Sequence, residues 1–161
     1  MNHVPSPVPT TSDENIERAI KVAGADKAPR VTPTDIAANI VSEWYFSAWE
    51  GAQLAYWADS DPENPKSIEG EPPKDVLSLL TICVLVLKNG FTVTGESACA
   101  SPENFNPEIG RKIAREKAVD KVWALMGYAL KETLANQRPV LTEADSLADL
   151  GGYPRPDHPT L

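Results

Sequence analysis

Two arginines spaced four residues apart are the clearest candidates for binding chemistry in this chain. Arg111 and Arg115 occur in the segment NPEIGRKIAREK, which begins like a helix. Asn106 is a favourable N-cap, Pro107 suits the first helical position, and Glu108 suits the first turn. Residues four apart share one face of a helix, so the two guanidinium groups would lie side by side. Since a guanidinium holds phosphate oxygens in pairs, this spacing predicts a phosphate or nucleotide site.

The residues just before this helix supply further candidates for the same site. Phe105 or Phe91 would stack on a base, and the sequence leaves the choice between them open. Ser97, Glu103 and Asn104 carry groups that hydrogen-bond to a ribose or a base edge. Together with the two arginines, these residues form the predicted ligand site.

A purely structural role for the arginines is the alternative, and the residues alone favour it in an arbitrary sequence. Arg111 would then pair with Glu108, and the stem of Arg115 would cover part of the core. Catalysis has less support, because the central segment has no histidine, and neither Glu96 nor Glu103 has a second carboxylate at a defined spacing. We therefore predict no enzyme activity, no cofactor and no metal site.

A β-hairpin at about residues 79–98 must position these groups. Asn89-Gly90, between apolar and β-branched residues, predicts a two-residue type I′ turn. Such a turn would pair Val86 with Val93. The first strand is apolar on both faces, so helices and a partner subunit are the two candidates to cover it.

Helices are predicted at about 33–46 and 107–136. Thr32 and Pro33 mark the start of the first. Its last turns also suit a strand, because Trp44 and the two aromatic residues after it favour sheets. The fold class expected is therefore α+β, with a small antiparallel sheet packed against helices.

The rest of the chain is predicted to contribute little to the core. Residues 1–30 would form a flexible arm with a possible short helix, and residues 31–138 a single α+β domain. Within the domain, the acidic, proline-rich segment 59–73 reads as a surface loop. Residues 139–161 read as a disordered tail.

Charge and hydropathy limit the partners of this 161-residue chain. A net charge of -8 argues against binding to duplex nucleic acid. The longest apolar run, Ile82 to Leu87, is too short to span a bilayer, and the N-terminus does not resemble a secretory signal. We expect a cytoplasmic protein with no membrane partner.

Two long segments resemble a known family. They are VTPTDIAANIVSEWYF, residues 31–46, and TICVLVLKNGFTVTGESACASPENFNPEIGRKIAREKAVDKVW, residues 81–123. Both closely resemble small proteins of tailed phages and prophages labelled Gp forty-nine-like. That pattern in turn resembles the Thoeris anti-defence proteins of the first type, which bind nucleotide immune signals and hide them from host effectors.

The resemblance implies a function and an assembly. The implied ligands are cyclic ADP-ribose isomers and, for some members, cyclic trinucleotides, sequestered without cleavage in the host cytoplasm. It implies a homo-oligomer, a dimer or hexamer, with pockets built from more than one subunit. The family's arginine pair is carried over onto Arg111 and Arg115. Two alternatives remain: a phage early protein that inhibits a host protein by direct binding and, with less support, a hydrolase of the nucleotide signal.

Overall fold

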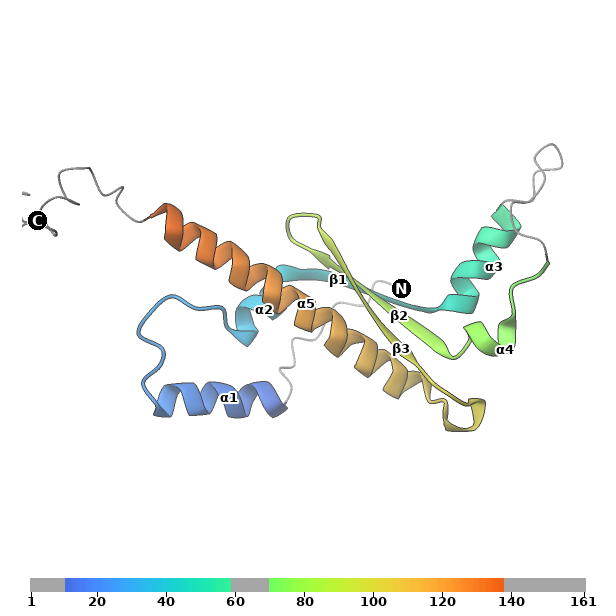
Figure 1. Cartoon of the computed structure of the whole chain (residues 1–161), viewed down its shortest axis with the longest axis horizontal. Helices are drawn as coiled ribbons and strands as arrows, with labels where there is room; N and C mark the ends of the chain where they lie inside the picture. Colours follow the sequence, from blue (N-terminus) through green and yellow to red (C-terminus); the bar gives the residue numbers. More distant parts are fainter. Residues whose placement is uncertain (1–10, 59–69, 138–161) are drawn as a thin grey trace, which may run out of the picture. The chain divides into compact units, whose positions relative to one another are not determined.

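The computed structural model describes residues 11–58 and 70–137 (Figure 1). Its elements are α1 (Thr11–Val22), α2 (Pro33–Asn39), β1 (Ile40–Ser47), α3 (Ala48–Ala58), α4 (Lys74–Leu77), β2 (Leu80–Leu87), β3 (Thr92–Ala98), the 3-10 turn η1 (Pro102–Asn104) and α5 (Pro107–Asn136). This arrangement confirms the α+β class. The predicted hairpin and the long C-terminal helix are present at the expected positions.

The chain divides into two compact units, residues 1–128 and 129–161. The sheet and every site residue discussed below lie in the first unit. The beginning of the predicted arm, residues 1–10, lies outside the described residues, as do the predicted tail at 139–161 and most of the predicted loop at 59–73. Among the described helices, none is long and apolar enough to cross a bilayer.

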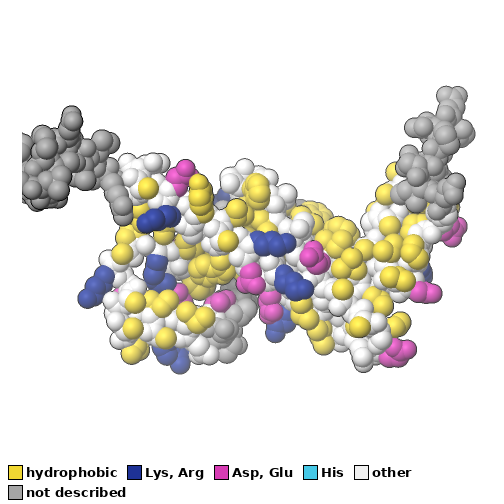
Figure 2. All heavy atoms as spheres, viewed as in Figure 1, with side chains coloured by type: hydrophobic (Ala, Val, Ile, Leu, Met, Phe, Trp, Pro, Cys, Tyr) yellow, Lys and Arg dark blue, Asp and Glu magenta, His cyan; other side chains and the backbone are white. Residues whose placement is uncertain are grey.

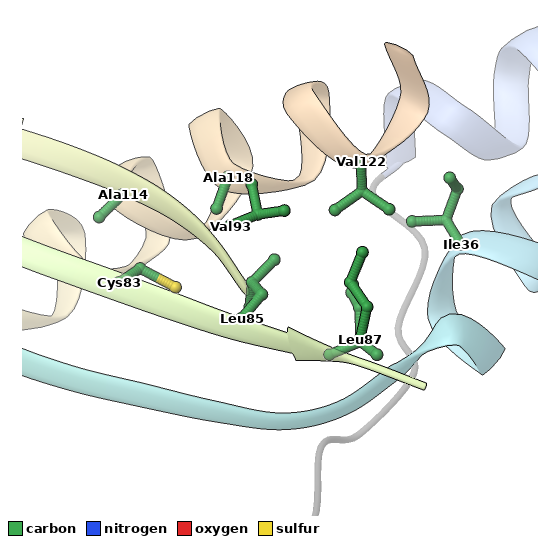
Figure 3. Close-up of a cluster of buried hydrophobic side chains, with 9 residues drawn as sticks. Ile36, Cys83, Leu85, Leu87, Val93, Ala114, Ala118 and Val122 are labelled. Atoms are coloured by element: carbon green, nitrogen blue, oxygen red, sulfur yellow. The ribbon is translucent and has the colours of Figure 1, made fainter. Parts of the chain in front are cut away.

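The three strands form one antiparallel sheet in the order β1-β2-β3. One face of this sheet packs against α5, and we call it the inner face (Figure 3). The buried residues between sheet and helices are Ile36, Ile40, Cys83, Leu85, Leu87, Val93, Ala114, Ala118 and Val122. β2 is the central strand, as its apolar sequence on both faces predicts.

The helix predicted at about 33–46 ends early, and the prediction for its second half is wrong. α2 stops at Asn39, and β1 runs from Ile40 to Ser47 along β2. Two capping boxes set these boundaries. Thr32 and Asp35 begin α2, while the Ser47 hydroxyl accepts from the Glu50 amide and the Glu50 carboxylate accepts from the Ser47 amide.

The predicted length of the hairpin loop is also wrong, because the loop has one residue more than the two predicted. The amide of Gly90 donates to the Leu87 carbonyl and that of Leu87 donates to the Phe91 carbonyl, which makes a three-residue loop. Within this loop only Gly90 has a positive φ, 83°, whereas a type I′ turn needs two such residues. Leu85 rather than Val86 therefore pairs with Val93.

This shift moves each β3 side chain to the opposite face from the one predicted. Gly95 lies opposite Cys83 on the inner face, and Ser97 lies opposite Thr81. Glu96, which the type I′ register would place opposite Cys83, instead pairs with Ile82 on the other face.

Replacement of Gly90 tests the turn. We expect Gly90→Ala to lower the free energy of unfolding by about 1 kcal/mol, because a side chain raises the energy of a positive φ. Gly127→Ala is the matched control: this glycine lies inside α5 with open space around it, so alanine should stabilise by up to about 1 kcal/mol. Urea unfolding measures both, and an equal effect of the two changes would contradict the turn.

Candidate functional site

The rotation of α5 about its axis decides which side chains reach the ligand site. A stripe of small residues, Gly110, Ala114 and Ala118, lies buried against the inner face. Opposite this stripe β3 has Gly95, where a Cβ atom would lie 2.5 Å from the Ala118 nitrogen and closer still to the Ala114 carbonyl oxygen. The backbones of β3 and α5 are therefore in contact at Gly95. Rotation of α5 about its axis would bring larger side chains into this contact, so the orientation of the helix is fixed.

This orientation directs Arg115 toward β1. Its Nε donates to both carboxylate oxygens of Glu43, at 2.9 and 3.0 Å, and its Nη2 donates to Oε1 at 2.7 Å. The Tyr45 hydroxyl donates to the same carboxylate at 2.7 Å. The side chain of Glu43 is only 5% exposed, so this is an ion pair inside the contact between sheet and helix. Arg115 thus has a structural partner.

The groups around this ion pair keep fixed charges near neutral pH. Hydrogen bonding to Glu43 raises the pKa of Arg115, so its guanidinium stays charged. Burial and the hydrogen bond to Glu43 raise the pKa of Tyr45, which remains a neutral donor. Burial raises the pKa of the Cys83 thiol to about 11, so the thiolate needed of a nucleophile is scarce. The cluster links α5 to β1.

Arg111, one turn earlier on α5, has a different environment. Its side chain is exposed and makes no hydrogen bond or ion pair within the described residues. Its charge acts on Glu50 at the start of α3. The pKa of Glu50 is lowered mainly by its hydrogen bonds with Ser47, and then by the charge of Arg111. Of the two predicted arginines, Arg111 is therefore the one available to a ligand.

The loop before α5 brings three of the other candidates next to this helix start. Phe105 is half-buried and ends η1, while Glu103 is exposed. The Asn104 amide donates to the Ser101 hydroxyl at 3.2 Å. The cap prediction is confirmed, because Asn106 Oδ1 accepts from the first free amides of α5.

Two of the predicted site residues lie elsewhere. Ser97 is 9% exposed and sits on the inner face beside Thr81, which lies against Gly110 of α5. Phe91 lies at the hairpin, at the opposite end of β3 from η1. Between the two aromatic candidates, only Phe105 is next to the start of α5.

Sequence reasoning missed Glu43 and Tyr45. The signal was a single acidic residue inside an aromatic strand, IVSEWYFS, but its basic partner is 72 positions away. No group of His, Cys, Asp or Glu side chains in the described part of the chain is arranged to hold a metal ion.

A cavity of about 610 Å³ lies away from all these residues, between α1 and residues 30–34. Four charged side chains of α1 line it. Arg30 at its edge is held by Glu17 through two bonds of 2.7 and 2.6 Å. It includes none of the predicted site residues.

Comparison with known proteins identifies the chain's family. A family model described as "Phage protein (N4 Gp49/phage Sf6 gene 66) family" matches residues 31–134, which contain the whole sheet and every predicted site residue. Comparisons with curated proteins and with solved structures found no match. Because the matched span is well over half of the 161 residues, the chain belongs to the phage protein family of N4 Gp49 and Sf6 gene 66.

Proposed function

We propose that this phage protein binds a nucleotide immune signal in the host cytoplasm and sequesters it without cleaving it. The observation that carries the proposal is Arg111, an exposed guanidinium with no partner within the described residues, held at the start of a rigid helix. Membership of a phage family and the resemblance to anti-defence proteins support the class of ligand.

The chemistry assigned to the site follows from what each group offers. Arg111 binds a phosphate through paired hydrogen bonds, and Phe105 stacks on the base. Glu103 and Asn104 hydrogen-bond to a ribose or base edge. The proposed ligands are cyclic ADP-ribose isomers or cyclic trinucleotides.

The ion pair of Arg115 bears on the assembly. Because Glu43 neutralises Arg115, each subunit offers one free arginine rather than two at this site. A ligand with two or more phosphates then needs a second cation, which a neighbouring subunit supplies. We therefore propose a homo-oligomer, a dimer or hexamer, with the ligand bound between subunits.

Replacement of Arg111 tests the site. A hydrogen bond to a charged group contributes roughly 1.5–3 kcal/mol, so Arg111→Ala should weaken nucleotide binding by about one to two decades. Arg111→Lys should also bind poorly, because an ammonium lacks the paired donors. Lys112→Ala, which removes the adjacent exposed cation on α5, is the matched control and should retain affinity.

Calorimetric titration with cyclic ADP-ribose isomers and cyclic trinucleotides measures these affinities. Mass spectrometry of the ligand released by heating then decides between sequestration and hydrolysis, since a cleaved product would mean an enzyme. Equal affinity of Arg111→Ala and wild type would place the site elsewhere.

Inhibition of a host protein by direct binding is the second candidate function. The observation that favours it is the sheet face opposite α5, where Trp44 is 55% exposed. Under this alternative, no nucleotide binds the wild-type protein in the titration above.

A further inference from the structure

The sheet face opposite α5, the outer face, is left largely uncovered by residues 11–58 and 70–137. Three successive cross-strand rows lie on it, made of Ser42, Trp44 and Phe46 of β1, Ile82, Val84 and Val86 of β2, and Thr92, Thr94 and Glu96 of β3. The β3 residues are exposed, and the three aliphatic residues of β2 are only half-buried. The central strand thus presents an apolar row that a sheet normally covers.

The neighbouring helix α3 is also apolar and also lacks a covering surface within the described residues. Its sequence, AWEGAQLAYWA, has one charged residue, yet none of its residues is buried. Leu54 is 72% exposed and Trp57 is 60% exposed. A helix that is apolar over most of its surface is normally buried. Figure 2 shows hydrophobic side chains gathered over the end of the molecule formed by α3 and α4.

These two surfaces are adjacent in the chain but do not cover each other. α3 follows β1 directly at Ser47 and meets the outer face at its Phe46 end, where a Cβ on Gly51 would be 3.4 Å from the phenyl ring. Trp44, one row further along the sheet, remains exposed. One copy of the chain therefore presents two exposed apolar surfaces, the outer face and α3, that could pack against each other in a dimer.

We propose that two copies of this chain pair through these surfaces, with α3 of each copy on the outer face of the other. A two-fold axis that crosses the strands at the middle row, Trp44–Val84–Thr94, brings each α3 to the hairpin end of the partner sheet. There the partner's Val86 lies under Leu54. This pairing goes beyond the proposed function, because it uses the sheet face away from α5 and needs no ligand.

The exposed area matches what a dimer of this kind needs. Trp44, Phe46 and Trp57 together expose roughly 350 Å², because a whole aromatic side chain has about 150–250 Å². Leu54, Val76 of α4 and the β2 row add to this, toward the roughly 800 Å² per partner of a standard interface. The surface has few charges, as the core of an interface between identical subunits does.

Sedimentation of the full chain tests the pairing without any nucleotide. We expect the wild type to be a dimer or a multiple of it at micromolar concentration. Trp44→Asp and Leu54→Asp should each weaken the dimer at least 100-fold. Val22→Asp is the matched control, because Val22 at the end of α1 is equally exposed and apolar but lies outside both surfaces. Circular dichroism confirms that each variant is folded, and Trp44→Ala serves as a milder variant.

A mixing experiment tests the proposed orientation. Leu54→Lys and Val86→Glu should each be monomeric alone, whereas a mixture of the two should form a heterodimer in which the new charges face each other.

A wild type that stays monomeric at about 100 μM, well above the dissociation constant of a standard interface, would overturn the pairing, as would dimers that survive Trp44→Asp. Loss of the dimer in Trp44→Asp but not in Leu54→Asp, or no heterodimer on mixing, would overturn the role of α3. A dimer without nucleotide affinity would contradict the proposed function and leave the pairing intact.

Discussion

Gly95→Ala is expected to destabilise the protein by about 3 kcal/mol or more, which lowers the melting temperature by roughly 10 °C. The added methyl group would meet backbone atoms of α5, the Ala114 carbonyl oxygen and the Ala118 nitrogen, rather than a side chain that can rotate away. The helix can relieve the overlap only by moving off the sheet. That movement would open the core between β2 and α5.

A second glycine in the same contact provides the comparison. At Gly110 a Cβ atom would lie 2.7 Å from the Thr81 hydroxyl, which is a side-chain atom. We expect Gly110→Ala to be destabilising alone and to be rescued largely by Thr81→Ala. No such rescue is available for Gly95→Ala, and Ala118→Gly should not provide it. A melting temperature of Gly95→Ala within about 2 °C of wild type would refute the contact, because that shift is under about 1 kcal/mol.

The long helix and the central strand were predictable because their signals are local. Asn106 and Pro107 mark the start of α5, and no proline interrupts the sequence before the helix ends at Asn136. The run from Leu80 to Leu87 is apolar on both faces, which indicates a central strand in any register.

β1 was missed because its polar and apolar residues alternate in the opposite sense to a typical half-buried strand. Its inner face carries Glu43, which is buried by an ion pair, while its outer face carries the exposed Trp44. Ile36, Ile40 and Trp44 also fit a helical spacing, so periodicity favoured the wrong structure. The partner that makes a glutamate acceptable inside the fold, Arg115, is remote in sequence. A single sequence does not reveal such a pairing.

The hairpin error had consequences for the site. An Asn-Gly pair is compatible with a two-residue or a three-residue loop, and only the second matches the single positive φ at Gly90. The difference of one residue puts Ser97 on the inner face, under α5. The arginine spacing was read correctly, but spacing alone does not distinguish Arg111, which is exposed, from Arg115, which is paired.

Arg115→Met is expected to lower the free energy of unfolding by about 3 kcal/mol, since it removes the guanidinium that pairs with the buried carboxylate of Glu43. Methionine retains most of the packing of the arginine stem, so the loss measures the charge rather than a cavity. Arg111→Ala, one turn earlier on the same helix, is the matched control. It breaks no bond within the described residues and should change the stability by no more than about 0.5 kcal/mol.

The cost of removing either partner of the ion pair should be unequal. The Glu43 side chain is 5% exposed and that of Arg115 is 26% exposed, so an unpaired Arg115 reaches water more easily than an unpaired Glu43. Glu43→Gln should therefore cost less than Arg115→Met. In the double variant the unpaired charge is gone, so its loss should fall short of the sum of the single losses by about 1–3 kcal/mol. Urea unfolding of the four proteins measures this coupling. Additive losses would mean that the contact between Arg115 and Glu43 does not hold α5 to β1, and Arg115 would then be free to join Arg111 in binding phosphate.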